Sequence, residues 1–322
     1  MAILVYAESW NGRFKKASYE AVSYASQLAN KLGTNAIALT IANKDDPGLL
    51  AKYGASKVII IDDESMEDFG NQAYANAISQ VADKESSDIL IVSNTNNGKS
   101  LSPILSVKMK SSLISNVIGL PSSIEPFVLK TKAFSSKAYV NYTTENKNKI
   151  ISITPNSVGI VENQKATETE KFDYVATDSD KRLKSLSINK SSGKISLIEA
   201  DMVVSAGRGL KGPENWGMIE ELADLLGAAT ACSKPVSDIG WRSHSEHVGQ
   251  TGIAINPQLY IAIGISGAIQ HLAGVNASKN IVVINTDPEA PFFKAADYGI
   301  VGDAFEVVPK LIDALKTYQS NN

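Results

Sequence analysis

The chain has 322 residues, which is enough for two domains that each bury a core of their own. Hydrophobic residues make up 43% and charged residues 20%, a composition typical of a soluble globular protein. The formal net charge of -3 argues against nucleic acid or anionic lipid as the main partner, since neither would gain from counterion release. The single cysteine excludes an intrachain disulfide framework and a cysteine-ligated metal cluster, and it indicates a reducing compartment.

The N-terminal run ILVYA has the character of a buried strand, so we expect no signal or transit peptide before it. No apolar stretch is long enough to span a membrane, and we therefore expect no direct membrane insertion. Together these features predict a cytoplasmic protein of a bacterium.

The first half of the chain alternates strand and helix patterns in the way expected for a parallel sheet. Strands are predicted at 3–7, 36–41, 58–62 and 88–93, and helices at 17–33, 68–83 and 101–111. From about residue 130 the pattern becomes rich in β-type alternation, in KAFSSKAYVNYTT and KIISITPNSV. We therefore expect the first α/β domain to end in a strand pair.

Residues 162–194 are polar and weakly periodic, which predicts an exposed connection with one edge strand and a boundary near Ser192. A second αβ series follows. Its predicted strands are 201–207, 228–232, 259–263, 280–285 and 298–301, and its helices are 213–227 and 304–318. The sequence thus predicts an α/β fold with two domains, 1–192 and 193–322, each with a mainly parallel sheet flanked by helices.

A glycine motif opens the second domain, with Gly207, Gly209 and Gly212 between a strand and a helix. This layout is that of a dinucleotide fingerprint, which also requires an acidic residue about 20 positions later. The next strand ends instead in Cys232, Ser233 and Lys234, which disfavours an ordinary nicotinamide site. A phosphate-bearing ligand near Arg208 fits the motif, and glycines that serve only a tight turn are the alternative.

Residues 231–252 form a long polar segment between two strands, and loops of this length tend to be functional. His244 and His247 suggest a metal site, but no third ligand is indicated, so we predict no metal. Lys234 and the GQTG turn fit the surroundings of an anionic, planar ligand, and a solvated lid is the alternative. Cys232 is predicted to be a small buried residue rather than a nucleophile.

The run GISGAIQHLAG follows the strand LYIAI and begins a helix that carries His271. A helix start provides free N–H groups for an anion, so this turn is a candidate ligand contact. Asn285, Asp287 and Asp303 stand at the ends of the last two strands, where open α/β sheets bind ligands. A half-buried structural histidine and ordinary helix caps are the alternatives.

Taken in order, these motifs resemble the alpha (large) subunit of electron transfer flavoproteins. The similarity covers most of residues 200–310, in SAGRGLKGPENW, SKPVSDIGW, VGQTG, PQLYIAIGISGAIQHLAG and INTDPEAPFFKAADYGIVGD. The first domain agrees only in its general pattern of alternating strands and helices. The resemblance implies a Rossmann-like C-terminal domain that binds FAD, a smaller beta subunit as partner in a heterodimer, and a first domain that mainly supports this partner.

The resemblance also implies which residues contact the isoalloxazine ring. Ser233 and Lys234 would approach the ring, and Thr251 would hydrogen-bond near flavin N5 with Gln250 beside it. Two residues depart from the family pattern, because arginine is usual at Lys234 and glutamine is usual at His247. Both differences concern the flavin potential and the stability of its semiquinone.

The remaining implied contacts lie along the cofactor. Arg208 would run beside it, Ser266 would lie near the ring, and His271 would lie near the C2 carbonyl. Asn285 and Asp303 would hold the adenosine end. No catalytic residue is implied, because the family carries electrons and does not transform a substrate.

The implied function is to shuttle electrons, through a flavin semiquinone, from flavin dehydrogenases such as the acyl-CoA dehydrogenases of fatty acid beta-oxidation to a quinone oxidoreductase. Three alternatives remain open. A bifurcating NADH-linked flavoprotein complex would keep the flavin. An NAD-dependent dehydrogenase built on the glycine motif would contain no flavin. A nucleotide-binding regulatory module would likewise contain no flavin.

Overall fold

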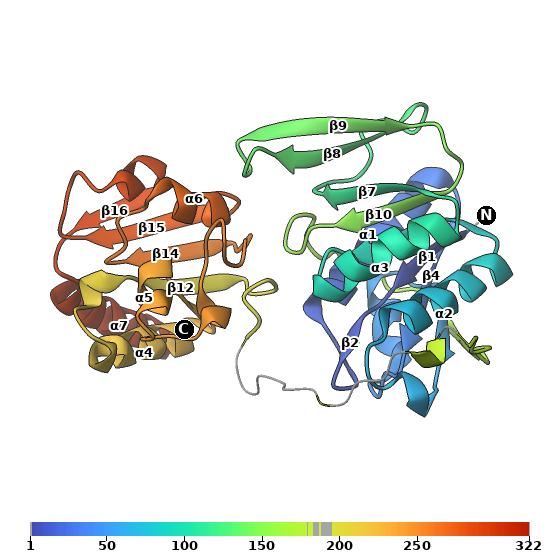
Figure 1. Cartoon of the computed structure of the whole chain (residues 1–322), viewed down its shortest axis with the longest axis horizontal. Helices are drawn as coiled ribbons and strands as arrows, with labels where there is room; N and C mark the ends of the chain where they lie inside the picture. Colours follow the sequence, from blue (N-terminus) through green and yellow to red (C-terminus); the bar gives the residue numbers. More distant parts are fainter. Residues whose placement is uncertain (1, 179, 183–186, 188–194, 322) are drawn as a thin grey trace. The chain divides into compact units, whose positions relative to one another are not determined.

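The computed structural model describes residues 2–178, 180–182, 187 and 195–321. The chain divides into two compact units, one made of Met1–Ala133 and Ala138–Lys190, the other mainly of Ser191–Asn322. Each unit is a separate sheet with helices on both faces (Figure 1). The predicted α/β fold with mainly parallel sheets is confirmed, whereas the predicted boundary at Ser192 lies outside the described residues.

The first unit is built on a nine-stranded sheet in the order β11-β5-β4-β1-β6-β10-β7-β8-β9. The strands from β11 to β7 pair in parallel, and β8 and β9 complete the sheet as an antiparallel hairpin. The strands are β1 (Ala2–Tyr6), β4 (Asn35–Ile41), β5 (Lys57–Ile61), β6 (Ser87–Ser93), β7 (Ser112–Val117), β8 (Phe127–Ala133), β9 (Ala138–Thr144), β10 (Lys149–Ile153) and β11 (Glu168–Lys171). The helices are α1 (Lys16–Leu32), α2 (Asn71–Lys84) and α3 (Asn96–Lys108), with short 3-10 turns at Pro47–Tyr53, Glu64–Met66 and Asp180–Arg182. A small hairpin, β2 (Ser9–Trp10) with β3 (Arg13–Phe14), follows β1.

The predicted terminal strand pair is wrong in one strand. Residues 138–144 do form the outer strand β9, but β10 lies inside the sheet between β6 and β7. The reason is that Ile150, Ile151 and Ile153 are buried, and a strand covered on both faces needs apolar side chains on both. The predicted edge strand within 162–194 is confirmed as β11, which pairs with β5.

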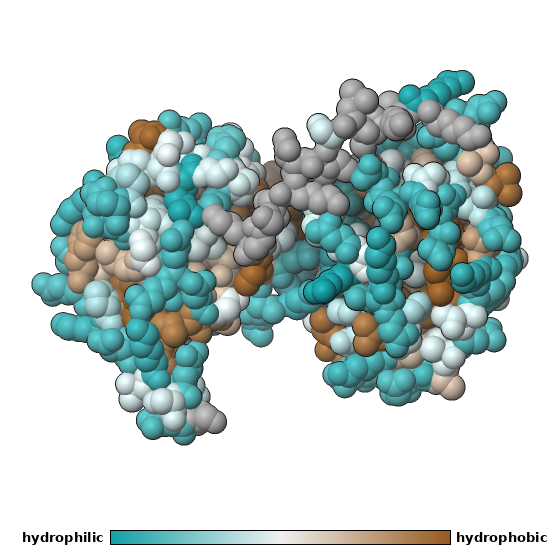
Figure 2. Space-filling view, turned by 90° about the horizontal axis from the view of Figure 1, so that it is seen from below, coloured by the Kyte–Doolittle hydropathy of each residue, from teal (hydrophilic) through white to brown (hydrophobic). Residues whose placement is uncertain are grey.

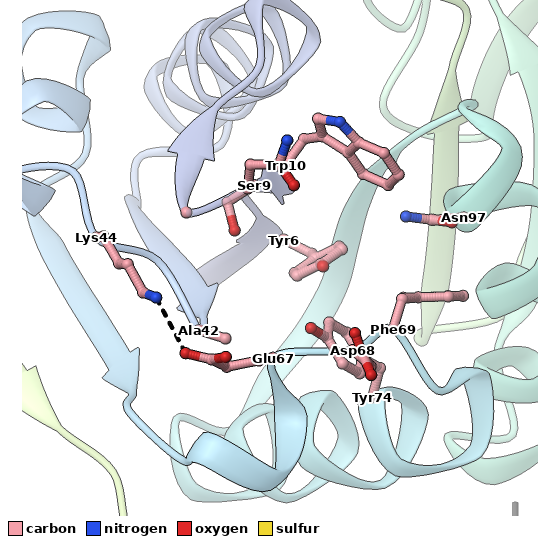
Figure 3. Close-up of a pocket in the computed structure, with 12 residues that line it drawn as sticks. Tyr6, Ser9, Trp10, Ala42, Lys44, Glu67, Asp68, Phe69, Tyr74 and Asn97 are labelled. Atoms are coloured by element: carbon pink, nitrogen blue, oxygen red, sulfur yellow. Dashed lines mark ion pairs between the residues drawn. The ribbon is translucent and has the colours of Figure 1, made fainter. Parts of the chain in front are cut away.

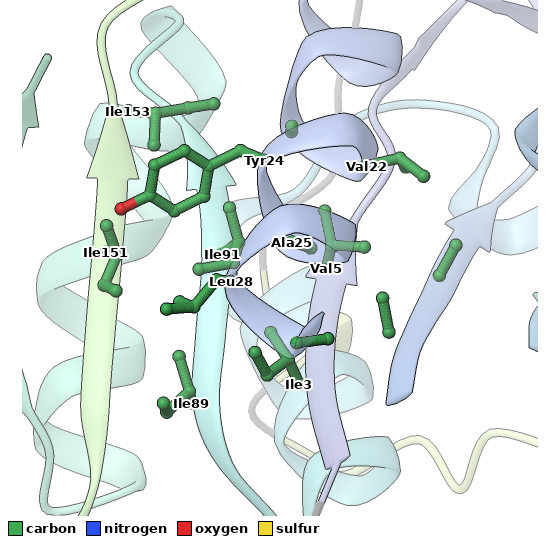
Figure 4. Packing of buried hydrophobic residues seen from close by; sticks show 14 of the residues in the cluster. Ile3, Val5, Val22, Tyr24, Ala25, Leu28, Ile89, Ile91, Ile151 and Ile153 are labelled. Atoms are coloured by element: carbon green, nitrogen blue, oxygen red, sulfur yellow. The ribbon is translucent and has the colours of Figure 1, made fainter. Parts of the chain in front are cut away.

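Alternating side chains of the parallel strands point to two separate cores. In Figure 4, Ile3 and Val5 of β1 face Val22 and Leu28 of α1. Leu4 and Tyr6 of the same strand belong to the opposite core, which α2 and α3 cover. Helix α3 begins earlier than predicted, because the side chain of Thr95 caps it by accepting from Gly98 N at 3.1 Å.

The second unit is a five-stranded, entirely parallel sheet in the order β13-β12-β14-β15-β16. The strands are β12 (Met202–Ala206), β13 (Ala229–Cys232), β14 (Leu259–Ile263), β15 (Asn280–Asn285) and β16 (Tyr298–Val301). The helices are α4 (Gly217–Leu226), α5 (Lys234–Asp238), α6 (Ile269–Val275) and α7 (Ala304–Ser320), with 3-10 turns at Arg208–Leu210, Pro213–Trp216, His244–Glu246 and Pro291–Ala295. Helices α4 and α7 cover one face, and α6 covers the other (Figure 1).

This strand order contains one reversal. From β12 the chain adds β13 on one side, then crosses to add β14, β15 and β16 on the other side. In open parallel sheets ligands bind at the carboxyl ends of the two strands where the direction reverses, here β12 and β14. The fold therefore points to the loops after these two strands.

The surface in Figure 2 is largely hydrophilic, with separate hydrophobic patches. Exposed large apolar side chains occur on several elements, including Phe134, Tyr139 and Tyr298. None of the described helices is long and apolar enough to cross a membrane.

Candidate functional site

The five strands of the second sheet end along one edge, where the predicted site residues follow them. Arg208 comes directly after β12, Lys234 shortly after β13, and Ser266 shortly after β14. Asn285 is the last residue of β15, and Asp303 follows β16. Neighbouring strands lie about 5 Å apart, so these residues form an extended row along the sheet edge, which suits an elongated ligand.

Two glycine loops make backbone contact at the reversal point. The Gly209 N–H donates to the carbonyl oxygen of Gly264 at 3.1 Å. A Cβ on Gly209 would lie 2.6 Å from the Gly264 Cα, and a Cβ on Gly207 would lie 2.3 Å from the Gly264 oxygen. Gly264 also has a φ of +61°, which disfavours any side chain there. These glycines therefore allow two loops to approach closely, and they do more than form a tight turn.

The loop after β14 offers unpaired backbone donors. The N–H groups of Ser266 and Gly267 donate to no acceptor within the described residues, and Ser266 is exposed. The carbonyl of Ser266 accepts from Phe292 N at 3.1 Å, which holds the loop in place. Free N–H groups on a fixed loop before a helix start are suited to an anionic group such as a phosphate.

His271 is a buried side chain with one free ring nitrogen. Its Nε2 is hydrogen-bonded to the Tyr260 hydroxyl at 2.8 Å, and its ring packs edge-on to Phe292. Burial, together with the nearby His247 ring, lowers the pKa of His271 to about 4, so the ring is neutral near pH 7. Its Nδ1 is buried and has no partner within the described residues. A purely structural role for His271 thus accounts for its Nε2, which is bonded to Tyr260, and leaves its Nδ1 available to a ligand.

His247 lies beneath the turn that carries Gln250 and Thr251. A Cβ on Gly252 would lie 2.8 Å from its Nδ1, and one on Gly249 would lie 3.3 Å from its Nε2. The turn is joined to α6 by Gln250 N, which donates to the Gln270 carbonyl at 2.7 Å. His247 is 2% exposed, whereas Gln250 and Thr251 are exposed. The turn is thus bonded to α6 and packed over His247, while its Gln250 and Thr251 side chains are exposed to solvent.

The pKa of His247 is lowered, first by burial and then by the neighbouring His244 and Lys234. The His244 and His247 rings are 5.5 Å apart between centroids, and Nδ1 of His244 is bonded to the Ser237 hydroxyl at 2.9 Å. Across the part of the chain that the structure describes, no three His, Cys, Asp or Glu side chains are grouped so as to hold a metal.

An ion pair closes the segment between α5 and the GQTG turn. The Arg242 guanidinium binds Glu246 with two hydrogen bonds, of 2.9 and 3.0 Å. Glu246 is 6% exposed, and Arg242 also contacts Glu220 and lies over the Trp216 ring. A buried carboxylate needs such a partner, so this pair holds the segment against the sheet.

Two cations near the row are exposed to solvent. Lys234 lies 3.6 Å from Asp238, one turn along α5. Within the described residues the exposed Arg208 has no ion-pair partner. Ser233 precedes Lys234 and is buried, and its N–H donates to the Ala206 carbonyl at 3.2 Å. Cys232 is buried as predicted, and burial raises the pKa of its thiol to about 12, so it is no nucleophile.

The last two predicted residues also have local roles. Asn285 donates from Nδ2 to the Ile265 carbonyl at 3.0 Å, which connects the ends of β14 and β15. Asp303 caps α7 by accepting from Phe305 N at 2.9 Å, and it lies 3.6 Å from Lys211 Nζ. The capping alternative is thus correct for Asp303, although Lys211 also joins it to the loop after β12.

Three contributors to this edge were missed in the sequence. Tyr260, the second residue of β14, is hydrogen-bonded to His271, and nothing in an apolar strand pattern distinguishes it. Gly249 and Gly274 let the GQTG turn approach α6, since a Cβ on Gly274 would lie 2.6 Å from the Gly249 Cα. Glycines in both segments were the only signal for that contact.

Family comparisons agree with this geometry. A family model described as "Electron transfer flavoprotein domain" matches residues 3–177, and one described as "Electron transfer flavoprotein FAD-binding domain" matches residues 196–276. The second match spans both glycine loops and His271.

Several relatives align over nearly the whole chain. An electron transfer flavoprotein subunit alpha from Thermoanaerobacterium thermosaccharolyticum is 37% identical, over 98% of this chain and 97% of that protein. One from Syntrophomonas wolfei is 34% identical, over 97% and 98%. Subunit LctC of a lactate dehydrogenase (NAD(+),ferredoxin) from Acetobacterium woodii is 30% identical, over 99% and 78%. The chain therefore belongs to the electron transfer flavoprotein alpha-subunit family, as its motifs predicted, and its second unit carries the family's FAD-binding domain.

Proposed function

We propose that this chain, paired with a beta subunit, carries electrons from flavin dehydrogenases such as acyl-CoA dehydrogenases to a membrane quinone oxidoreductase, within the bacterial cytoplasm. Alpha subunits of this family are electron-transfer proteins that pair with beta subunits. The observation that carries the proposal is the contact of two glycine loops at the reversal point of an entirely parallel sheet that matches the FAD-binding family.

The residues along this edge fit FAD. A buried imidazole nitrogen without a partner, unpaired N–H groups at Ser266 and Gly267, and an exposed Arg208 match a ligand with ring carbonyls and a pyrophosphate. In our proposal Asn285 and Asp303 hold the adenosine end, and Arg208 lies beside the middle of the cofactor. Bound FAD supplies redox chemistry that can proceed one electron at a time.

The ring end of the proposed site contains residues from three segments: Ser233 and Lys234, Gln250 and Thr251, and Ser266 with His271. Lys234 contributes a positive charge, which favours electron uptake nearby. His271 is neutral, and a neutral imidazole carries one N–H. If the Tyr260 hydroxyl donates to Nε2, that proton is on Nδ1, which then donates to an acceptor of the bound ring.

His247 acts indirectly in this proposal, because it fills the underside of the turn that presents Thr251. Glutamine at this position would offer an amide where the imidazole now lies. We therefore assign His247 to positioning the turn.

A second candidate is a role in an electron-bifurcating, NADH-linked complex. The relative from Acetobacterium woodii is described as part of a lactate dehydrogenase that uses NAD(+) and ferredoxin. Both candidates use the same alpha-subunit site. They differ in whether the beta subunit holds a second redox-active flavin.

The test is stepwise anaerobic reduction of the purified alpha-beta complex, followed by visible absorption. We expect one-electron-reduced flavin to accumulate. Lys234→Ala should make the one-electron potential more negative by about 60 mV, the equivalent of a tenfold change for one electron. Lys310→Ala, which removes an exposed lysine on α7, is the matched control and should leave the potential unchanged.

Direct two-electron reduction in the wild-type complex would contradict the one-electron carrier. Two flavins per complex, one of them reduced by NADH, would support the bifurcating role. A complex that contains no flavin after FAD is supplied would overturn both.

A further inference from the structure

The histidine of the proposed flavin site is bonded to a tyrosine of the sheet. Tyr260 is the second residue of β14 and is fully buried. Its hydroxyl is hydrogen-bonded to Nε2 of His271 at 2.8 Å, while Nδ1 of the same ring is buried without a partner within the described residues. The position of the imidazole proton therefore decides whether Nδ1 offers a ligand a donor or an acceptor.

Three aromatic rings hold this pair in one arrangement. Tyr260 stacks on Phe292 with 6.2 Å between the ring centroids, and His271 packs edge-on to the same ring at 5.6 Å. Phe292 also supports the loop after β14. Its N–H donates to the Ser266 carbonyl at 3.1 Å, and a Cβ on Gly267 would lie 2.5 Å from the Phe292 Cβ. The bond between tyrosine and histidine is thus part of the packing that supports a loop of the proposed site.

A second buried hydroxyl lies on the same face of the sheet. Val203 of β12 is opposite Tyr260 of β14, and side chains two residues apart on a strand share a face, so Ser205 is on the side of Tyr260. Ser205 is fully buried, and its Oγ makes no hydrogen bond of regular geometry within the described residues. Burial raises the pKa of Tyr260, and the Ser205 hydroxyl is close enough to oppose this rise. Ser205 is therefore a donor available to the Tyr260 oxygen.

The pair has two possible proton arrangements. Both side chains are neutral near pH 7, because burial keeps the pKa of Tyr260 high and lowers the pKa of His271 to about 4. The pair then carries one O–H and one ring N–H. If Tyr260 donates to Nε2, the ring proton is on Nδ1. If Nε2 donates to Tyr260, Nδ1 carries no proton and the tyrosine O–H needs another acceptor.

The number of buried donors favours the first arrangement. When Tyr260 donates to His271, Ser205 can donate to the Tyr260 oxygen, and only the Nδ1–H is left for a ligand to accept. In the reverse arrangement Tyr260 would donate to Ser205. The Ser205 hydrogen would then have no acceptor on this face of the sheet, whose buried cluster is apolar and includes Val203 and Phe292. A buried donor without an acceptor is costly, so Tyr260 is the donor to the imidazole.

We propose that Tyr260 is a positioning residue of the flavin site: it donates to Nε2 of His271 and keeps the imidazole proton on Nδ1, and Ser205 holds Tyr260 in this direction. His271 then donates from Nδ1 to a carbonyl of the bound ring. A hydrogen bond strengthens when its acceptor gains negative charge, so a fixed donor there favours uptake of the first electron. This inference rests on the flavin contact proposed for His271 and adds the residues that set its protonation.

The first measurement is the tautomer of His271, by nitrogen-15 NMR of the FAD-loaded alpha-beta complex with labelled histidine in the alpha chain. The chain has three histidines, and comparison with His271→Gln assigns the signals of interest. We expect the wild-type ring to carry its proton on Nδ1. Tyr260→Phe keeps the aromatic ring and removes the donor, so it should show a mixture of both tautomers.

The second measurement is the potential of the first electron, by anaerobic redox titration of the same complexes. Tyr260→Phe should make this potential more negative by about 60 mV, the equivalent of a tenfold change for one electron. Ser205→Ala should shift it in the same direction by less. Tyr298→Phe removes an exposed hydroxyl from β16 and is the matched control, which should change neither the tautomer nor the potential.

A double-mutant cycle separates positioning from a general structural effect. In the His271→Gln background Tyr260→Phe should shift the potential no further, because Tyr260 acts through the imidazole. The wild-type tautomer and Ser205→Ala decide the question even if Tyr260→Phe does not retain flavin.

Three results would overturn this inference and leave FAD binding intact. They are a wild-type ring proton on Nε2, an unchanged potential in flavin-loaded Tyr260→Phe, and a full further shift by Tyr260→Phe in the His271→Gln background. A wild-type complex that contains no flavin would instead overturn the proposed function, and this inference with it.

Discussion

Both units contain a parallel sheet whose strand order reverses once, but the residues that follow the strands at the two reversal points differ. In the second unit Gly209 and Gly264 bring two loops into backbone contact, and the donors around them are N–H groups and exposed cations. In the first unit a cavity at this position is lined by aromatic side chains, such as Trp10 and Phe69, together with polar ones, such as Lys44 and Asp68 (Figure 3). Topology determines where a ligand can bind, and the side chains at that place determine which kind of ligand binds there.

The two units also share a structural feature. Each contains, near the reversal of its sheet, a buried carboxylate with charged or polar partners. Glu8 connects Lys15 and Asn97 in the first unit, and Glu246 binds Arg242 in the second. The difference is that the second carboxylate belongs to the unit that matches the FAD-binding family, so we expect changes in the two units to have separable consequences.

The largest effect on flavin binding is expected from a methyl group at the glycine contacts. Gly209→Ala would put a Cβ 2.6 Å from the Gly264 Cα, so the loops must separate. We expect FAD affinity to fall about tenfold or more, since overpacking typically costs about 1–3 kcal/mol. Flavin-to-protein ratios of the purified complex, measured by absorption, give the result.

Gly98→Ala is the matched change in the first unit, because its Cβ would lie 1.8 Å from the Ser93 carbonyl oxygen. It should lower the melting temperature while the folded complex keeps its flavin. If Gly98→Ala released FAD and Gly209→Ala did not, the assignment of the flavin site to the loops around Gly209 would be wrong.

The next effect concerns the buried carboxylates. Arg242→Met would leave Glu246 buried without its cation, which costs about 3 kcal/mol in such pairs. We expect lower stability in urea together with weaker flavin retention. Lys15→Met should also destabilise the protein, through Glu8, but leave flavin retention unchanged. Lys316→Met removes an exposed pair with Glu221 and serves as the surface control. Equal flavin loss in all three variants would remove the distinction between the units.

The smallest effect on flavin binding is expected from a pH dependence of stability in the second unit, which contains all three histidines of the chain. Burial lowers the pKa of His271 from 6.5 to about 4, so between these values the unfolded chain takes up a proton that the folded chain does not. Stability therefore falls as the pH falls through this window, by about 2 kcal/mol at pH 5.

His271→Gln should reduce this loss, as measured by urea unfolding at pH 7 and pH 5, and exposed His244→Gln should not. Hydrogen exchange at pH 5 should show the added opening in the second unit. Equal pH dependence in the wild type and His271→Gln would contradict the assignment.

Much of this architecture was already predictable from local patterns. Three strands of the second sheet, β14, β15 and β16, have the predicted bounds, because short apolar runs between polar turns are a local signal. Since parallel strands share a direction, residues after each strand must lie on one edge, and Arg208, Ser266 and Asp303 do so. The order of motifs was sufficient to identify the family.

The sequence by itself thus determined the α/β class, the strand ends that carry the candidate site, and the family. Only the tertiary structure decided which strands are neighbours, such as β10 between β6 and β7, and which distant residues touch. The contact of Gly209 with Gly264 and the bond of Tyr260 to His271 depend on packing between separate segments of the chain. Such contacts leave no periodic pattern in the sequence, because they follow from how close whole elements can approach, and that is set by the glycines and side-chain volumes of both partners together.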